Sequence, residues 1–244
     1  MTENRSFDDV SERIKWFDAN YAEIKERIAA AAKRAGRDPS EIHLLAATKT
    51  VPVEVINHAI ASGIKLIGEN RVQELCSKID MLDDSAVRHH IGRLQTNKVK
   101  QVVGKVQMIE SVDSVKLAEE IGKQSRRLGI VTDVLVEINI GNEDAKSGIS
   151  AVECEPFLRQ IAAIEGIRVR GLMAIPPICE NEAEICQYFN KMYKLFIDIS
   201  GKRIDNISMD YLSMGMSGDF EQAIESGANI IRLGTVLFGQ RNYN

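Results

Sequence analysis

The chain is short of the residues that build disulfides, metal sites and membrane spans. It has only four cysteines, without a Cys-x-x-Cys pair, and its four histidines complete no metal-ligand pattern with them. We therefore expect reduced structural thiols and no bound metal. Residues 1–10 are polar and acidic, whereas a signal peptide is basic and then apolar, and no apolar run approaches the length of a membrane span. These absences predict a cytoplasmic protein that does not contact a membrane.

An excess of one charge is also absent. The formal net charge is -4, the pI is near 5.7, and charged residues of both signs are spread along the sequence. This balance argues against a nucleic-acid surface and favours small molecules or proteins as partners. No repeat, low-complexity stretch or Pro/Ser-rich linker interrupts the chain, so we expect residues 1–244 to form one domain.

Short apolar runs alternate with longer helical patterns along the chain. The expected strands cover residues 42–47, 64–67, 87–91, 106–109, 134–138, 169–173, 207–212 and 230–233. The expected helices between them cover residues 53–61, 71–81, 95–103, 114–128, 151–164, 183–199 and 219–226. A first helix is expected from Asp8 to Ala35, with Gly36 as its stop.

Eight strands that alternate with helical crossovers predict a parallel (β/α)₈ TIM barrel, and the chain length suits that fold. Residues 1–36 would supply an extra N-terminal helix whose apolar face packs on the outside of the barrel. An open doubly wound sheet is the competing interpretation. It is disfavoured because no Gly-x-Gly-x-x-Gly turn follows the first strand.

Lys49 is the first candidate functional residue. It follows a buried strand, at the end where a parallel barrel opens into its loops. A lysine amine held in such a half-buried place can attack a carbonyl and form a Schiff base. The simpler interpretation is that Lys49 reaches solvent from the end of its strand.

Two polar, glycine-rich loops follow the seventh and eighth strands. They are Ser213-Met214-Gly215-Met216-Ser217-Gly218 and Arg232-Leu233-Gly234-Thr235. Barrels of this type often bind phosphate between these two loops, where glycines let the backbone approach the anion and hydroxyls add donors. The first loop runs into a helical pattern near Asp219, so its amides would also present a helix N-terminus. Taken singly, the first loop could be an ordinary one with capping serines.

A lysine amine opposite a phosphate site suits two chemistries. One is a Schiff-base aldolase that acts on a phosphorylated sugar, and the other is the binding of pyridoxal phosphate (PLP), which carries both an aldehyde and a phosphate. Arg232 favours PLP, because a guanidinium at the end of the last strand can donate to the ring nitrogen. Alternatively, Arg232 forms a plain salt bridge with a nearby carboxylate.

At these residues the sequence closely resembles the YggS/PROSC family of pyridoxal phosphate homeostasis proteins, whose fold is like the barrel domain of alanine racemase. The matching motifs include Gly-Glu-Asn-Arg-Val-Gln-Glu at 68–74 and Ile-Gly-Arg-Leu-Gln-Thr-Asn-Lys at 91–98. The other matching segments are residues 46–50, 67, 89–90, 146–148, 171–173, 212–219 and 231–239. Together they span nearly the whole chain in order.

The resemblance implies a role for each candidate residue. It implies that Lys49 holds PLP as an internal aldimine and that Arg232 faces the pyridine nitrogen. The phosphate would be held by Ser217, Gly234 and Thr235, and the residues near the ring would be Asn70, Ser213 and Met214. The sequence departs from the family at Arg88-His89-His90, where Trp-His-Phe is usual. We interpret His90 as a hydrogen-bonded polar core residue rather than a catalyst.

A non-enzymatic function follows from these assignments. An arginine at the pyridine nitrogen disfavours ring protonation and weakens the electron sink that carbanion chemistry needs. The family resemblance implies that the protein buffers PLP or delivers it to PLP-dependent apoenzymes, and we expect no catalytic residue. The alternative is an amino-acid racemase with Lys49 as its base. Alanine racemase also takes a tyrosine from a second domain, which is not expected in a chain that ends at Asn244. We expect a monomer in preference to a dimer.

Overall fold

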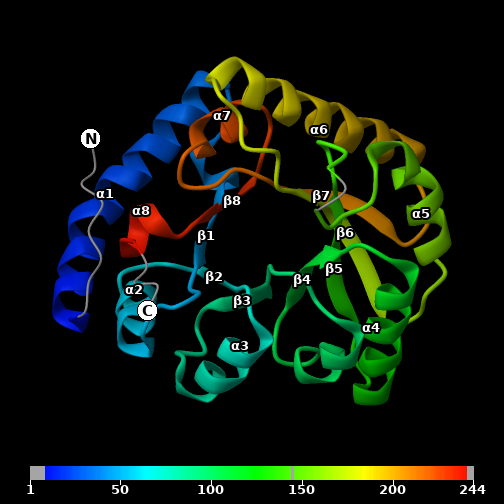
Figure 1. Ribbon diagram of the computed structural model, residues 1–244, viewed down its shortest axis with the longest axis horizontal. Coiled ribbons are helices and arrows are strands. Elements are labelled where there is room, and N and C mark those ends of the chain that lie inside the picture. The colour runs from blue at the N-terminus through cyan, green and yellow to red at the C-terminus, as the bar shows by residue number, and fades with distance from the viewer. Residues whose placement is uncertain (1–8, 144–145, 241–244) are drawn as a thin grey trace.

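Eight parallel strands close into a barrel in the computed structural model of the chain, which describes residues 9–143 and 146–240 (Figure 1). Each strand pairs with the next in sequence, and the eighth pairs with the first. The strands are β1 (His43–Ala47), β2 (Leu66–Glu69), β3 (Val87–His90), β4 (Met108–Val112), β5 (Thr132–Ile138), β6 (Ile167–Ala174), β7 (Ile207–Ser213) and β8 (Ile230–Leu233). The predicted barrel is confirmed, and its closure excludes the open sheet.

The strands present alternate side chains to the inside and the outside of the barrel. Inward-facing apolar residues form two small clusters that are separate from the main core. The first contains Leu45, Leu66, Ile91 and Ile230, the second contains Met108, Leu135 and Met173, and Tyr211 packs against both. The main core lies between the outer faces of the strands and the surrounding helices. The barrel interior is therefore packed, and the strand ends beyond these clusters are free to carry polar residues.

Helices surround the barrel, as Figure 1 shows. They are α2 (Val53–Ala61), α3 (Val72–Lys78), α4 (Val115–Leu128), α5 (Cys154–Ile161), α6 (Glu182–Lys202) and α7 (Phe220–Glu225). A short helix that the sequence did not predict, α8 (Thr235–Phe238), follows β8 directly. Its single turn is too short to produce a recognisable helical period.

The long first helix, α1 (Val10–Arg34), lies outside the barrel against α2, α7 and α8 (Figure 1). Asp9 caps it by accepting a hydrogen bond from the Ser11 amide at 2.8 Å. Phe17 is fully buried and stacks on Phe238, with 5.8 Å between the ring centroids. The expected packing of this helix on the barrel is confirmed, while residues 1–8 lie outside the described part of the chain.

Several expected elements differ from the structure; the second strand, for example, was expected at residues 64–67 and runs from Leu66 to Glu69. The crossover expected as a helix at residues 95–103 is a 3₁₀ helix, η3 (Thr96–Gln101), because its amides bond three residues back, as from Lys98 to Gln95. The fourth strand was expected at residues 106–109 but runs from Met108 to Val112. The apolar run ends at Ile109, which set the expected end of the strand. The strand nevertheless continues through the buried, charged Glu110, where its register with β5 shifts.

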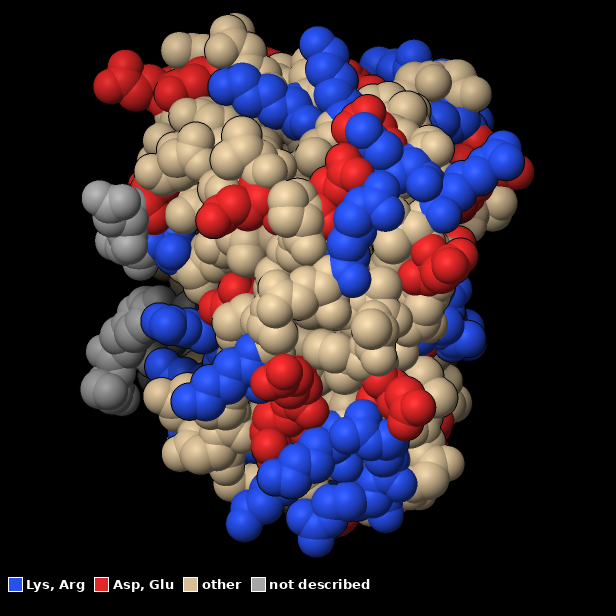
Figure 2. Space-filling model, turned by 90° about the vertical axis from the view of Figure 1, so that its right-hand side faces the viewer, with Lys and Arg blue, Asp and Glu red and all other residues tan. Residues whose placement is uncertain are grey.

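The surface and the cysteines agree with the sequence analysis where the structure describes them. Figure 2 shows the side that carries α4 and α5, where basic and acidic side chains are interspersed around a band of uncharged residues. All four cysteines are free thiols. Among the described residues, no helix is long and apolar enough to cross a membrane and no group of side chains forms a metal site.

A glycine is required at position 171, where β6 lies against the backbone of β7. Its φ is +149°, and a Cβ atom there would lie 1.8 Å from the carbonyl oxygen of Tyr211. We predict that Gly171→Ala lowers the free energy of unfolding by at least about 2 kcal/mol, because backbone must move to admit the methyl group. Urea unfolding would measure this loss. The matched control is Gly201→Ala in α6, where a Cβ meets nothing within 4 Å and a gain below about 1 kcal/mol is expected. Equal midpoints for the two variants would contradict the prediction.

Candidate functional site

Lys49 lies in the loop that leaves β1 at the carboxyl-terminal end of the barrel. The Thr48 amide still donates to the Gly68 carbonyl at 2.9 Å, so the ladder between β1 and β2 continues past Ala47. Strand alternation then places Lys49 on the inner face, with Leu45 and Ala47. The Lys49 residue is half-buried. Its amine is therefore presented at the mouth of the barrel rather than on the outer surface.

The two loops predicted to bind phosphate lie side by side. The Ser217 hydroxyl, from the loop after β7, accepts hydrogen bonds from the Gly234 and Val236 amides, both at 3.4 Å. At this length the bonds are weak, so the hydroxyl and the two amides form a group of donors gathered around one point. A Cβ atom on Gly234 would lie 3.6 Å from Ala47, which places this group beside β1. Thr235 is exposed at the start of α8 in the same loop.

Arg232 is held rigidly inside the barrel mouth. It is 5 % exposed, and its guanidinium donates to the Ser213 hydroxyl at 2.7 Å and to the Ala174 carbonyl at 2.9 Å. The Ser213 hydroxyl in turn donates to Glu110 at 2.6 Å, and the other Glu110 oxygen lies 2.6 Å from Nδ1 of His89. A continuous hydrogen-bonded chain therefore connects β8, β7, β4 and β3.

Glu110 supplies the negative charge that balances Arg232. Burial alone would raise the pKa of this fully buried carboxyl, but the hydrogen bond and charge of His89, with Arg232 and Ser213, hold it below its usual value. Burial lowers the pKa of the Arg232 guanidinium, and Glu110 is the foremost group that opposes this. The pair keeps a fixed positive guanidinium in a place without bulk water.

Glu137 of β5 is a second buried carboxylate near Arg232. Burial raises its pKa, whereas the hydrogen bond from Ser147 at 2.7 Å and the charge of Arg232 lower it. Ser147 reaches Glu137 because Ile149 bonds to the end of β5 through two backbone hydrogen bonds. The Ser147 hydroxyl is thus brought to the buried carboxylate of β5.

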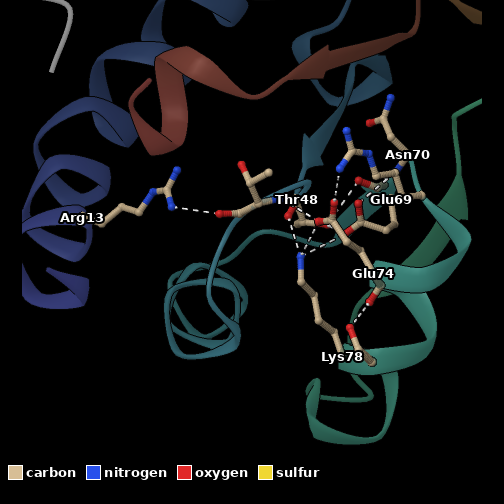
Figure 3. Close-up of polar contacts among 10 residues, drawn as sticks. Arg13, Thr48, Glu69, Asn70, Glu74 and Lys78 are labelled. Carbon is tan, nitrogen blue, oxygen red and sulfur yellow. Dashed lines mark hydrogen bonds and ion pairs between the residues drawn. The ribbon is translucent and has the colours of Figure 1, made fainter. Parts of the chain in front are cut away.

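A polar network outside the barrel fixes the backbone around Lys49 (Figure 3). The ammonium of Lys78 on α3 donates to the Thr48 carbonyl at 3.1 Å, to Glu69 at 3.3 Å and to Glu74 at 3.1 Å. Glu69 also accepts from the Thr48 hydroxyl, and Glu74 accepts from the Thr50 amide at 2.7 Å. Burial raises the pKa of Glu69, and Lys78 opposes that shift. The residues on both sides of Lys49 are therefore bonded to α3.

Asn70 follows β2 and is partly exposed. Its backbone passes so close to Gly92 that a Cβ atom on residue 92 would lie 2.1 Å from the Asn70 carbonyl oxygen. Asn70 also lines an open cavity of about 610 Å³ between the loops that follow β2, β3 and β4. The structure thus brings the loops of two sequence motifs together beside the barrel mouth, with Asn70 at the edge of the cavity.

The structure adds two details of the loop after β7. The Met214 side chain is fully buried in the main core, on the opposite side of the chain from Ser213, so only its backbone can face the mouth. The helix expected near Asp219 begins at Phe220, and the Met216 amide of the loop already donates to Asp219 at 2.6 Å.

The chain is similar to proteins of one family along almost its whole length. The alanine racemase N-terminal domain family matches residues 19–242. The pyridoxal phosphate homeostasis protein of Aquifex aeolicus is 46 % identical over 221 residues, which are 90 % of this chain and 96 % of that protein. The protein of the same name from Escherichia coli K12 is 37 % identical, over 92 % of this chain and 97 % of its own. The chain belongs to the pyridoxal phosphate homeostasis protein family.

Solved structures support this family assignment. PipY of Synechococcus elongatus, solved with PLP bound, is 32 % identical, with a TM-score of 0.77 over 88 % of this chain and 100 % of that one. Alanine racemase of Clostridium difficile is 15 % identical, with a TM-score of 0.73 over 93 % of this chain and 58 % of its own. The latter likeness concerns the fold alone. This family member thus has the alanine racemase barrel, as the sequence predicted.

The roles of three carboxylates in this family member were not predicted from its sequence. The expected second and fourth strands ended before Glu69 and Glu110, whereas Glu137 lay inside its expected strand but was not assigned to the site. The signal that could have found Glu110 is its spacing of two from the inward-facing Met108. An inward carboxylate in a barrel mouth needs a cation, and Arg232 had already been singled out.

His90, which replaces the usual aromatic residue of the family, is fully buried on the outer face of β3. Among the described residues, neither ring nitrogen has a partner at full hydrogen-bond geometry, so the structure does not show the expected hydrogen-bonded core histidine. Burial lowers the pKa of His90 to about 4, against an opposing backbone interaction with Gly92, and the ring stays neutral. His90 therefore fills the space of an aromatic ring in the core and does not face the barrel mouth.

The charge balance around Arg232 can be tested through Glu110. Because the folded-state pKa of Glu110 is lowered, its contribution to stability is present above the unfolded-state pKa and is lost as pH falls through the folded-state value. We predict that Glu110→Gln costs about 3–5 kcal/mol of unfolding free energy at neutral pH. Urea unfolding across pH should show this difference shrinking in acid.

The matched control is Glu120→Gln, a partly exposed carboxylate on α4 that pairs with Lys123. Its effect should stay within about 1 kcal/mol at every pH, as expected for a surface pair. If the loss for Glu110→Gln were absent, or as large in acid as at neutral pH, Arg232 would not depend on the Glu110 charge.

Proposed function

We propose that this protein binds PLP reversibly through a Schiff base with Lys49 and serves to buffer or deliver the cofactor, without catalytic turnover. The observation that carries the proposal is the position of Ala47, the end of β1 two residues before Lys49, next to Gly234, whose amide and that of Val236 donate to the Ser217 hydroxyl. This arrangement supports a primary amine and a group of phosphate donors in one barrel mouth. The function also agrees with the names of the similar proteins from A. aeolicus and E. coli.

The donor set fits the groups of PLP one by one. Lys49 would add its amine to the aldehyde carbon, so that a C=N bond forms and the carbonyl oxygen leaves as water. Ser217, Gly234 and Thr235 would hold the phosphate, through amides and hydroxyls that require no titration. Asn70, Ser213 and the backbone of Met214 would lie near the ring. The whole described chain then acts as one cofactor-binding domain.

Arg232 determines what the bound cofactor can do. Its guanidinium is fixed by Ser213 and Ala174 and is balanced by Glu110, so it remains a cation beside the proposed position of the pyridine nitrogen. Protonation of that nitrogen would place two positive charges together in a buried site, which is unfavourable. PLP supplies an electron sink for carbanion chemistry when its ring is protonated, so Arg232 weakens that chemistry. The site favours storage of the aldehyde over its use.

A storage site has a chemical rationale, because free PLP reacts with amines indiscriminately. Reversal of the Schiff base by water or by another amine would release the cofactor to PLP-dependent apoenzymes, which we propose as the recipients. The proposal needs neither a metal nor a nucleic acid, and it places the protein in the cytoplasm, acting as a monomer.

The covalent link can be tested by absorbance spectroscopy. We predict that the purified protein, loaded with PLP, shows a near-visible band that borohydride abolishes by reducing the C=N bond. Lys49→Ala should lack the band, because no amine remains at that position. Persistence of the band in Lys49→Ala would assign the link to another lysine, and no band in the wild type would remove the Schiff base from the proposal. A Schiff-base aldolase, in contrast, predicts protein that is colourless as purified, before any PLP is added.

The absence of turnover needs a separate measurement. We predict that the PLP-loaded protein, incubated for a prolonged time with each enantiomer of the amino acids, forms the opposite enantiomer no faster than free PLP does. The physical reason is the weakened electron sink at Arg232. Chiral chromatography of the mixture would measure this rate. Enzyme-level interconversion of any amino acid would replace storage with racemase activity.

A further inference from the structure

Arg13 is a buried cation on α1 whose presence the fold alone does not explain. It is 7 % exposed, and it donates through Nε to the Phe238 carbonyl at 2.8 Å and through Nη1 to the Thr50 carbonyl at 3.0 Å. Among the described residues no carboxylate pairs with it. Burial lowers the pKa of the guanidinium, which reflects the cost of removing the charge from water. An apolar side chain would pack against the barrel without that cost.

The two carbonyls that Arg13 joins belong to the two halves of the proposed cofactor site. Thr50 follows Lys49 directly, so its carbonyl lies at the end of the segment that carries the amine. Phe238 is the last residue of α8, the single turn that begins beside Gly234 at the phosphate loop. The two carbonyls therefore lie on the segments that carry the amine and the proposed phosphate donors. Figure 3 shows Arg13 reaching this loop from the side opposite Lys78.

Thr50 has a backbone conformation that must be held in place. Its φ is +61°, in the left-handed region, which costs a β-branched residue about 1–2 kcal/mol. Glu74 accepts from its amide at 2.7 Å and Arg13 donates to its carbonyl at 3.0 Å. The strained turn beside Lys49 is therefore fixed from two sides, by α3 and by α1.

The helix that carries Arg13 is itself anchored to α8. Phe17 lies one turn further along the same face of α1 and stacks on Phe238. Both side chains of α1 therefore contact Phe238: the Arg13 guanidinium bonds to its carbonyl, and the Phe17 ring stacks on its ring. Motion of α8 relative to the Lys49 loop would have to break the Arg13 hydrogen bonds or this stack.

We propose that Arg13 is a positioning residue, which sets the span between the Lys49 amine and the phosphate donors to the span of PLP. The inference rests on the proposed function and adds to it a role for the N-terminal helix. PLP is a rigid ring with two anchored ends, so binding at one end raises the effective concentration of the other end only when the two anchors are held at the right separation. Loosening the span should weaken two-ended binding and leave each single-ended contact intact.

The test compares three ligands on four proteins. PLP uses both anchors, pyridoxal offers only the aldehyde, and pyridoxine 5′-phosphate offers only the phosphate. The proteins are the wild type, Arg13→Met, Arg13→Lys and the control Arg34→Met. Arg34 is on the same helix, about 30 Å further along its axis, and donates to Glu221 and Glu225 of α7. Equilibrium titration, with absorbance for the two aldehydes and calorimetry for the third ligand, gives each Kd.

We predict that Arg13→Met weakens PLP binding by about tenfold or more, while its Kd values for pyridoxal and pyridoxine 5′-phosphate change by about twofold or less. Arg13→Lys should show the same selective loss, because the single nitrogen of an ammonium cannot occupy both the Nε and the Nη1 positions from which Arg13 donates. Its retained charge and stem provide a folded variant if Arg13→Met does not fold. Arg34→Met should bind all three ligands as the wild type does.

Two results would overturn the inference. One is unchanged PLP affinity in both Arg13 variants, and the other is an equal loss for all three ligands, which is the signature of a merely structural role. Failure of the proposed function is distinguishable, because the wild type itself would then bind no PLP. A wild type that binds PLP beside Arg13 variants that bind it equally well would reject the positioning role alone.

Discussion

The charge balance between Arg232 and Glu110 is the constraint on which the rest of the barrel mouth depends. A guanidinium and a carboxylate are both buried there, and Ser213 joins them by donating to one and accepting from the other. Removing either charge would leave the other unpaired in a place without bulk water. The balance fixes the arginine in position and ties β3, β4, β7 and β8 together. The same residues therefore stabilise the fold and define the chemistry of its open end.

The site combines an inner and an outer layer of support. The inner layer orients Arg232 through hydrogen bonds along the barrel mouth. The outer layer, formed by Lys78, Glu69 and Glu74, holds the backbone on both sides of Lys49 from α3. A reactive amine that is positioned by a clamped backbone loses little further freedom on binding a ligand. The two layers together make a site that is arranged before its ligand arrives.

Much of this arrangement was accessible from the sequence. The strands β5 and β8 were predicted because each contains a short apolar run of strand length. The two glycine-rich loops were predicted to bind phosphate because they follow the seventh and eighth strands of the barrel. The β4 strand was misplaced because Glu110 interrupts the apolar run, although its buried charge is balanced by residues distant in sequence. Met214 was assigned to the site from the family resemblance, whereas its side chain lies in the core and only its backbone can face the mouth. Properties that depend on a partner far along the chain were the ones that local patterns could not supply.

The seam between β1 and β8 gives the site a further property. The proposed amine, Lys49, follows the first strand, and two of the proposed phosphate donors, Gly234 and Thr235, follow the last, which pairs with the first through Leu45 and Arg232. A nascent chain therefore has no complete site until its final strand has been added. A ligand that contacts both sides of the seam binds the closed barrel alone, and it shifts the equilibrium away from any form in which β8 has detached. Such a ligand would stabilise the closed barrel, so its free concentration in the cell would also determine the fraction of the protein that stays closed.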